Sequence, residues 1–177
     1  MSRNNHMNLD PHLAKIQDFP KPGITFYDIS PVLEDPEILQ KTVSRVAEIA
    51  AEYQPDVIVG LDARGFLFCV PVALQLGLGT VMVRKAGKLP GDVIEASYSL
   101  EYGEATLAVQ TARQLQGKRI VIVDDLLATG GTVAAAQKLL TQVGAEVVAS
   151  LFLIELSGLN GRERLSGDVQ ALQTYDF

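Results

Sequence analysis

The stretch that most constrains the fold spans residues 120–132 and combines a strand, a loop of small residues and the start of a helix. Four aliphatic residues at 120–123 are typical of a buried strand. Two adjacent carboxylates, Asp124 and Asp125, follow where we expect that strand to end. A loop with two glycines and two threonines comes next, and residues 133–140 have the pattern of a helix. This strand–loop–helix unit is typical of an α/β domain.

The unit has the chemistry to bind a phosphorylated sugar. Backbone N–H groups of a glycine-containing loop can point at a phosphate, and the helix N-terminus adds positive potential. Threonine hydroxyls supply further donors, and the carboxylates can accept hydrogen bonds from sugar hydroxyls. Because paired acids repel each other, we expect a cation nearby. The alternative is an ordinary turn in which Asp125 or Thr129 only caps the backbone. The spacing matches neither a Walker loop nor the dinucleotide fingerprint.

Composition narrows the class of protein. A chain of 177 residues is long enough for one domain with a substantial core. Its net charge of −6 argues against nucleic acid as a partner, because such binding needs a concentrated basic face. The single cysteine, Cys69, lies in an apolar run and is expected to be a packed core thiol. With no membrane-length apolar stretch and no signal-peptide pattern, we expect a cytoplasmic protein with no membrane partner.

Apolar periodicity and turn residues predict an alternation of helices and strands along the chain. We expect helices at 11–18, 36–53, 66–76 and 133–143, and strands at 56–61, 80–84, 96–102, 105–111, 120–123, 146–154 and 169–175. Residues 24–33 are expected to be extended or irregular, and residues 161–165 to form a helical turn. The polar segment 85–103 predicts a mobile functional loop whose second part belongs to a hairpin. The alternation predicts a parallel sheet flanked by helices, with ligands beyond the carboxyl ends of the strands.

The sequence Asp-Asp-Leu-Leu-Ala-Thr-Gly-Gly-Thr at 124–132 resembles the phosphoribosyl pyrophosphate (PRPP) signature of the type I phosphoribosyltransferases. It is close to the form that this signature has in the adenine-specific members. The resemblance covers roughly 19–165, with five motifs in order. It implies a single domain over 1–177, with an N-terminal arm and small hood over about 1–34, a core over about 35–177 and a flexible loop or hairpin. It assigns ribose and phosphate binding to Asp124, Asp125, Ala128, Thr129, Gly130, Gly131 and Thr132.

Two further segments resemble the pyrophosphate-binding loops of that family. The turn at 62–65 follows a predicted strand, and Arg64 can make bidentate contacts to a phosphate. Residues 84–90 place three cations within five positions. The alternatives are a salt-bridged surface turn and a solvated basic turn. The resemblance assigns pyrophosphate binding to Ala63, Arg64, Gly65, Arg84, Lys85 and Lys88.

The segment 19–31 resembles the hood that covers the base in the adenine-specific members. Phe26 would stack on the base, and the backbone around Thr25 would read its edge. Tyr27 stands where that group often has arginine. Glu155 and Leu156 resemble the pair that closes the other side of the base pocket. The resemblance therefore assigns adenine binding to Thr25, Phe26, Tyr27 and Leu156. For Phe26 alone, a buried aromatic residue under a loop is the alternative.

The string Ser-Leu-Glu-Tyr-Gly at 99–103 resembles the flexible catalytic loop of the same group. Glu101 matches the carboxylate assigned there to proton handling on the purine ring. The alternative is an exposed glutamate of a β-hairpin. The resemblance assigns catalytic roles to three residues: Glu101, Arg64 and Lys88.

The resemblance implies transfer of the 5-phosphoribosyl group from PRPP to adenine, giving AMP and pyrophosphate in purine salvage. It implies Mg²⁺ as the cofactor, carried with PRPP near Asp124 and Asp125 without a dedicated protein cage, and a homodimer. One alternative is transfer to hypoxanthine, guanine, xanthine or orotate. Another is a non-catalytic regulator that senses PRPP and controls nucleic acids, against which the negative charge argues.

Overall fold

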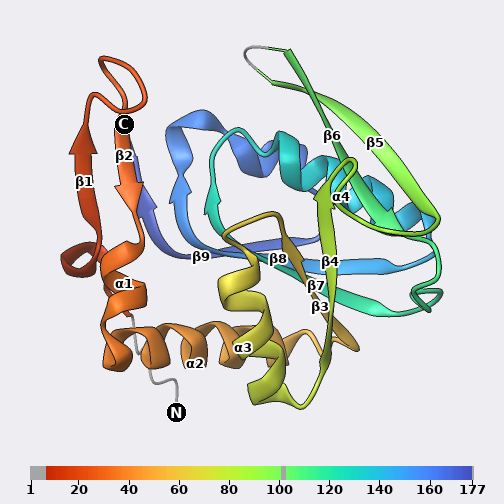
Figure 1. Ribbon diagram of the computed structural model, residues 1–177. Coiled ribbons are helices and arrows are strands. Elements are labelled where there is room, and N and C mark those ends of the chain that lie inside the picture. Colours follow the sequence, from red (N-terminus) through yellow and green to blue (C-terminus); the bar gives the residue numbers. More distant parts are fainter. Residues whose placement is uncertain (1–6, 101–102, 177) are drawn as a thin grey trace.

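A seven-stranded sheet forms the centre of the protein (Figure 1). The computed structural model describes residues 7–100 and 103–176. The strands are β3 (Val57–Leu61), β4 (Gly79–Lys85), β5 (Val93–Leu100), β6 (Gly103–Gln110), β7 (Arg119–Leu127), β8 (Glu146–Leu156) and β9 (Asp168–Tyr175). Their spatial order is β5-β6-β4-β3-β7-β8-β9. The five strands from β4 to β9 in this order are parallel, and β6 and β5 continue the sheet antiparallel, which confirms the predicted fold class.

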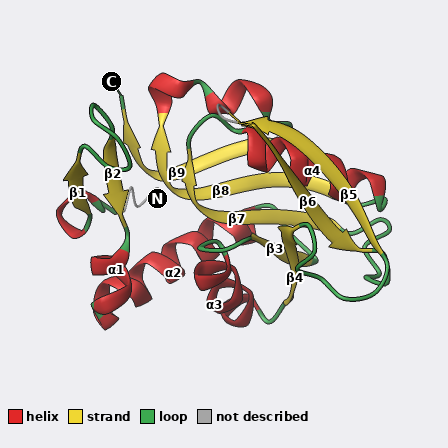
Figure 2. Ribbon diagram, turned by 45° about the horizontal axis from the view of Figure 1, so that its top comes forward, coloured by secondary structure: helices red, strands yellow, loops and turns green. Residues whose placement is uncertain are grey.

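Helices cover both faces of this sheet (Figure 2). On one face lie α2 (Pro36–Glu52) and α3 (Phe66–Leu76), and on the other lies α4 (Gly131–Gln142). Successive side chains of a strand point to opposite faces, so Val121 and Val123 pack with α2 and α3 while Ile120 and Ile122 pack with α4. The uninterrupted aliphatic run at 120–123 therefore reflects a strand that is buried on both faces.

Both helices on the first face have the predicted bounds to within one residue, because their end signals are local. The Asp35 carboxylate accepts hydrogen bonds from the backbone N–H groups of Glu37 and Ile38, at 2.9 and 3.1 Å, directly at the start of α2. Gly77 adopts a left-handed conformation with φ of 68° and ends α3. Cys69 on α3 is buried as expected, and burial raises the pKa of its thiol to about 11.

The predicted helix at 11–18 is wrong. The segment instead forms a short 3-10 turn, η1 (Asp10–His12), and then β1 (Ala14–Gln17), which pairs antiparallel with β2 (Thr25–Asp28) before α1 (Ser30–Glu34). Pairing with a strand eleven residues away overrides the local pattern, a competition that local propensity cannot decide. This two-stranded unit stands apart from the main sheet and beside the end of β9 (Figure 1).

The segment predicted as a mobile loop contains more strand than expected. β5 begins at Val93 and pairs with β6 from Val93 opposite Gln110 to Leu100 opposite Gly103. The hairpin extends over the α4 side of the sheet (Figure 2). Glu101, the predicted catalytic carboxylate, lies outside the described residues. Within the described parts of the chain, no helix has the length and apolar character needed to cross a membrane.

Candidate active site at the carboxyl ends of β3 and β7

The site arises where two neighbouring strands send their chains in opposite directions. β3 and β7 are parallel neighbours, with Val57 opposite Ile120 and Gly60 opposite Val123. The chain leaves β3 through α3 toward β4 on one side, and leaves β7 through α4 toward β8 on the other. Such a divergence opens a crevice at the carboxyl ends of the strands. A cleft of about 240 Å³ lies there, lined by Asp62, Ala63, Arg64 and residues 124–133.

The loop predicted to bind phosphate, residues 128–132 (the phosphate loop), follows directly after β7. We expected the strand to end before Asp124, but it continues to Leu127, because β8 pairs with it as far as Leu127 opposite Glu155. Both carboxylates are therefore held on a strand inside the sheet. Gly130 then adopts φ of 78° and precedes α4, so the first turn of that helix borders the cleft. All seven residues predicted to bind ribose and phosphate line this cleft.

A second glycine supports the phosphate loop from behind. A Cβ on Gly130 would lie 2.4 Å from the Gly161 carbonyl oxygen, and a Cβ on Gly161 would lie 2.2 Å from the Ala128 oxygen. The short turn η3 (Gly161–Arg164) therefore packs backbone against backbone on the phosphate loop. The sequence predicts this helical turn but not its contact, because thirty residues separate the two segments.

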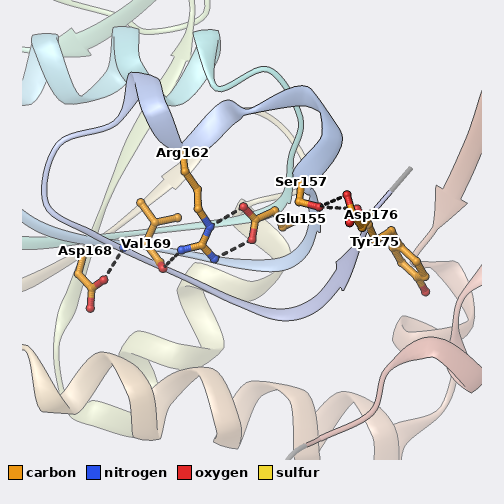
Figure 3. Close-up of polar contacts among 7 residues, drawn as sticks. All are labelled: Glu155, Ser157, Arg162, Asp168, Val169, Tyr175 and Asp176. Carbon is orange, nitrogen blue, oxygen red and sulfur yellow. Dashed lines mark hydrogen bonds and ion pairs between the residues drawn. The ribbon is translucent and has the colours of Figure 1, made fainter.

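Arg162 fixes that supporting turn to the sheet (Figure 3). Its Nε and Nη2 atoms donate to Oε1 and Oε2 of Glu155, at 2.5 and 2.6 Å, and its Nη1 donates to the Val169 carbonyl oxygen. Glu155 is buried, and both of its oxygens are occupied by this bidentate ion pair. No sequence motif points to Arg162. Leu156, which follows Glu155 and is predicted to line the base pocket, is half-buried against the core.

The paired acids have the expected cation beside them. Arg64 Nε lies 2.8 Å from Asp125 Oδ2, yet this buried oxygen accepts no well-aligned hydrogen bond. Asp124 Oδ1 accepts from the backbone N–H of Asp125 at 3.0 Å. Burial, and then the charge of Asp125, raise the pKa of Asp124 well above its usual range. Burial also raises the pKa of Asp125, while Arg64 opposes this shift. The pair therefore holds protons more readily than exposed aspartates do.

The predicted pyrophosphate loop packs tightly against the acids. The Asp62–Ala63 peptide bond is cis. A Cβ on Gly65 would lie 2.7 Å from Asp124 Oδ1 and 2.9 Å from the backbone nitrogen of Leu61, so only glycine fits. Arg84 on β4 donates from Nε to Asp62 Oδ2 at 3.0 Å and holds the loop from the neighbouring strand. Lys85 is the last residue of β4 and Lys88 follows that strand; both are exposed, and neither lines the cleft.

The hood brings one predicted base contact close to the cleft. The Arg64 guanidinium lies 5.5 Å from the centre of the Phe26 ring, which packs edge-on against Phe19 at 5.2 Å. Neighbouring strand residues point to opposite sides, and Tyr27 accordingly stacks on Tyr175 at 4.2 Å. The Thr25 hydroxyl donates to Gln17 at 2.9 Å. The adenine-binding roles of these residues stay predictions.

Comparisons with known proteins agree with this arrangement. The phosphoribosyl transferase domain family matches residues 31–173. Adenine phosphoribosyltransferases from Rhodospirillum rubrum and Gluconobacter oxydans are 54% and 50% identical to the chain, over 96% of its length and 99% and 95% of theirs. The chain belongs to the adenine phosphoribosyltransferase family.

Solved structures of family members share the fold. The enzyme from Thermoanaerobacter pseudethanolicus superimposes with a TM-score of 0.91 at 43% identity, covering 94% of this chain and 98% of that one. The enzyme from Saccharomyces cerevisiae, solved with an iminoaltritol bisphosphate and adenine, gives a TM-score of 0.88 at 41% identity, with 93% and 96% coverage.

Replacing Gly130 with alanine should disrupt the phosphate loop. The new Cβ would collide with the Gly161 backbone in a left-handed conformation, so the loop must move. We expect the KM for PRPP to rise by about tenfold to a hundredfold, since small displacements of binding groups have effects of this size. Steady-state kinetics check this. Gly117→Ala is the control, because Gly117 has φ of 71° but open space around it. An equal KM rise in both variants would contradict the prediction.

Replacing Asp124 with asparagine should stabilise the unliganded fold while impairing activity. The pKa of Asp124 is raised on folding, so the free energy of unfolding falls as pH rises from the unfolded-state pKa toward the folded-state pKa. Asparagine removes this penalty and keeps an acceptor for the Asp125 N–H. The gain in Tm should be small near pH 4 and largest at about pH 8. Thermal unfolding across this range checks it, with Asp92→Asn as an exposed control. A lower Tm at pH 8 would show the charge to be stabilising.

Proposed function

We propose that this protein transfers the 5-phosphoribosyl group of PRPP to adenine and forms AMP and pyrophosphate, as a step of purine salvage. The observation that carries the proposal is that the phosphate loop and the turn residues Asp62, Ala63 and Arg64 line one cleft, with Phe26 packed beside Arg64. The phosphate loop would bind the 5-phosphate end of PRPP, and the turn would bind its pyrophosphate end. The yeast relative solved with adenine and a bisphosphate supports adenine as the base.

The reaction breaks the bond between the anomeric carbon and pyrophosphate, and it passes through an oxocarbenium-like ribosyl centre as in glycoside hydrolysis. The phosphate loop holds the 5-phosphate, so the ribosyl group is fixed for attack by the base. Arg64 stands at the cleft to stabilise the negative charge of the departing pyrophosphate, and Arg84, Lys85 and Lys88 are the further cations we assign to it. Glu101 handles the proton of the purine ring.

Mg²⁺ fits the donor set of the site. Mg²⁺ is commonly bound through one or two carboxylates plus substrate phosphates and water. Asp125 Oδ2 is buried at the cleft without an aligned hydrogen-bond donor, so it can serve a cation or a ribose hydroxyl. Asp124 and Asp125 would hold the ion, which supplies charge neutralisation to the phosphates.

Product formation from PRPP with a panel of bases tests the proposal. With Mg²⁺, adenine should give AMP, while hypoxanthine, guanine, xanthine and orotate should react far more slowly. Asp125→Ala should reduce turnover by about a hundredfold or more, because it removes a charge aimed at the reacting ribose. Asp92→Ala is the matched control on the surface. Turnover on another base would overturn the assignment of adenine, and PRPP binding without turnover would indicate a regulator.

A homodimer is supported by an apolar stripe on α3. Leu67, Val70 and Leu74 lie three and four residues apart on one helix face and are 48%, 44% and 74% exposed, and Met82 on neighbouring β4 is 46% exposed. Contiguous exposed apolar side chains commonly mark protein interfaces. A second copy of this chain would cover the stripe with its own, as the two-fold symmetry of most dimers allows.

Introducing a charge into this stripe tests the homodimer. Leu74→Lys should convert a dimer to a monomer, since the charge would be buried in the interface without a partner. Light scattering after size-exclusion chromatography measures the mass. Ile16→Lys, at a similarly apolar exposed position on β1, should leave the dimer intact. A monomeric wild-type protein would refute the homodimer.

We assign the reaction to the cytoplasm, because phosphorylated sugars are charged and a charge is costly to move through a bilayer. Nucleic acid is not a partner in this proposal, in keeping with the net charge of −6.

A further inference from the structure

The hydroxyl of Tyr98 reaches the phosphate loop from the hairpin strand β5. Thr132 Oγ1 donates to the Tyr98 hydroxyl at 3.1 Å. Thr132 is the second residue of α4 and lines the cleft, whereas Tyr98 does not line it. The sequence motifs indicate no role for Tyr98. The contact therefore connects the cleft to a residue behind it.

The position of Tyr98 follows from the pleat of β5. Ile94, Ala96 and Tyr98 alternate along the strand and share the face that packs into the apolar cluster formed by α4 and the sheet, here called the α4 cluster. Ser97 points to the opposite face, where its hydroxyl bonds that of Thr106 at 2.9 Å. The apolar part of the ring is thus packed against the cluster while its hydroxyl is directed at the start of α4. Packing alone would be satisfied by phenylalanine.

We propose that Tyr98 is a positioning residue for the 5-phosphate, which aims the Thr132 hydroxyl at that phosphate by donating a hydrogen bond to it. This inference rests on the proposed function, because it assumes that the loop binds a phosphate. A hydroxyl can both donate and accept. An ionised phosphate only accepts, so Thr132 must turn its single hydrogen toward the ligand. Tyr98 then becomes the donor, and the contact persists with its direction reversed.

The resulting chain runs from Tyr98 O–H to Thr132 O–H to phosphate. Consecutive hydrogen bonds polarise one another and strengthen the last link. The Tyr98 donor also occupies one lone pair of the threonine oxygen and restricts rotation of its hydroxyl, so less freedom is lost when the ligand binds. The effect acts through Thr132 on the phosphate end of the substrate, and it does not touch the bond that breaks.

Tyr98→Phe removes only the hydroxyl and tests the inference. We expect the affinity for ribose 5-phosphate, measured by calorimetry, to fall about fivefold to tenfold, as for loss of one net hydrogen bond. The KM for PRPP should rise by a similar factor, while kcat and the KM for adenine stay within about twofold. Pyrophosphate affinity should not change. Tyr53→Phe is the matched control, because that hydroxyl bonds Asp168 and Gln170 away from the cleft.

A double-mutant cycle separates positioning from general packing. In a Thr132→Val background the hydroxyl chain is already broken, so Tyr98→Phe should have no further effect on ribose 5-phosphate affinity. Equal effects of Tyr98→Phe with and without the Thr132 hydroxyl would overturn the inference, as would wild-type affinity in the single variant. Ribose 5-phosphate binding that depends on Tyr98, in a protein that converts no base, would refute the proposed function and leave this inference standing.

Discussion

Parallel pairing of β3 with β7 is the constraint on which the site depends. It brings the Ala63–Gly65 turn and the phosphate loop to one edge of the sheet, although about sixty residues separate them in the chain. The chain then leaves the two strands in opposite directions, so their loops part and a crevice remains. The approach is close enough that Gly65 has no room for a Cβ beside Asp124. The same register places Arg64 against Asp125.

Two kinds of ion pair serve different purposes around this crevice. Glu155–Arg162 and Asp62–Arg84 are aligned, hydrogen-bonded pairs that hold a supporting turn and a loop in place. Asp125–Arg64 is close but poorly aligned, and it leaves a buried oxygen free for a ligand. Burial that raises the pKa values of Asp124 and Asp125 opposes folding at neutral pH. Groups kept ready for a ligand therefore reduce the stability of the unliganded protein, as is common at functional sites.

Support for the phosphate loop comes from segments that carry no signature of their own. Gly161 packs against its backbone, Arg162 anchors that glycine to β8 and β9, and Tyr98 contacts its threonine. These residues lie on two elements, η3 and β5, and none of them lines the cleft. A binding loop rich in glycine and threonine has little stiffness by itself, so its geometry depends on such neighbours.

The sequence by itself determined the α/β class, the bounds of α2 and α3 to within one residue, and the position of the phosphate loop, because apolar periodicity, caps and glycine-rich turns are encoded locally. It also indicated Arg64 and the paired acids as site residues. Only the tertiary structure decided that residues 14–17 form a strand, that β7 runs through both acids, and that Arg162 and Tyr98 support the loop. Those outcomes depend on which distant segments pair and in what register, and single-sequence patterns carry little information about register. Tyr27 shows the difference within one motif, since its stacking on Tyr175 depends on a partner 148 residues away.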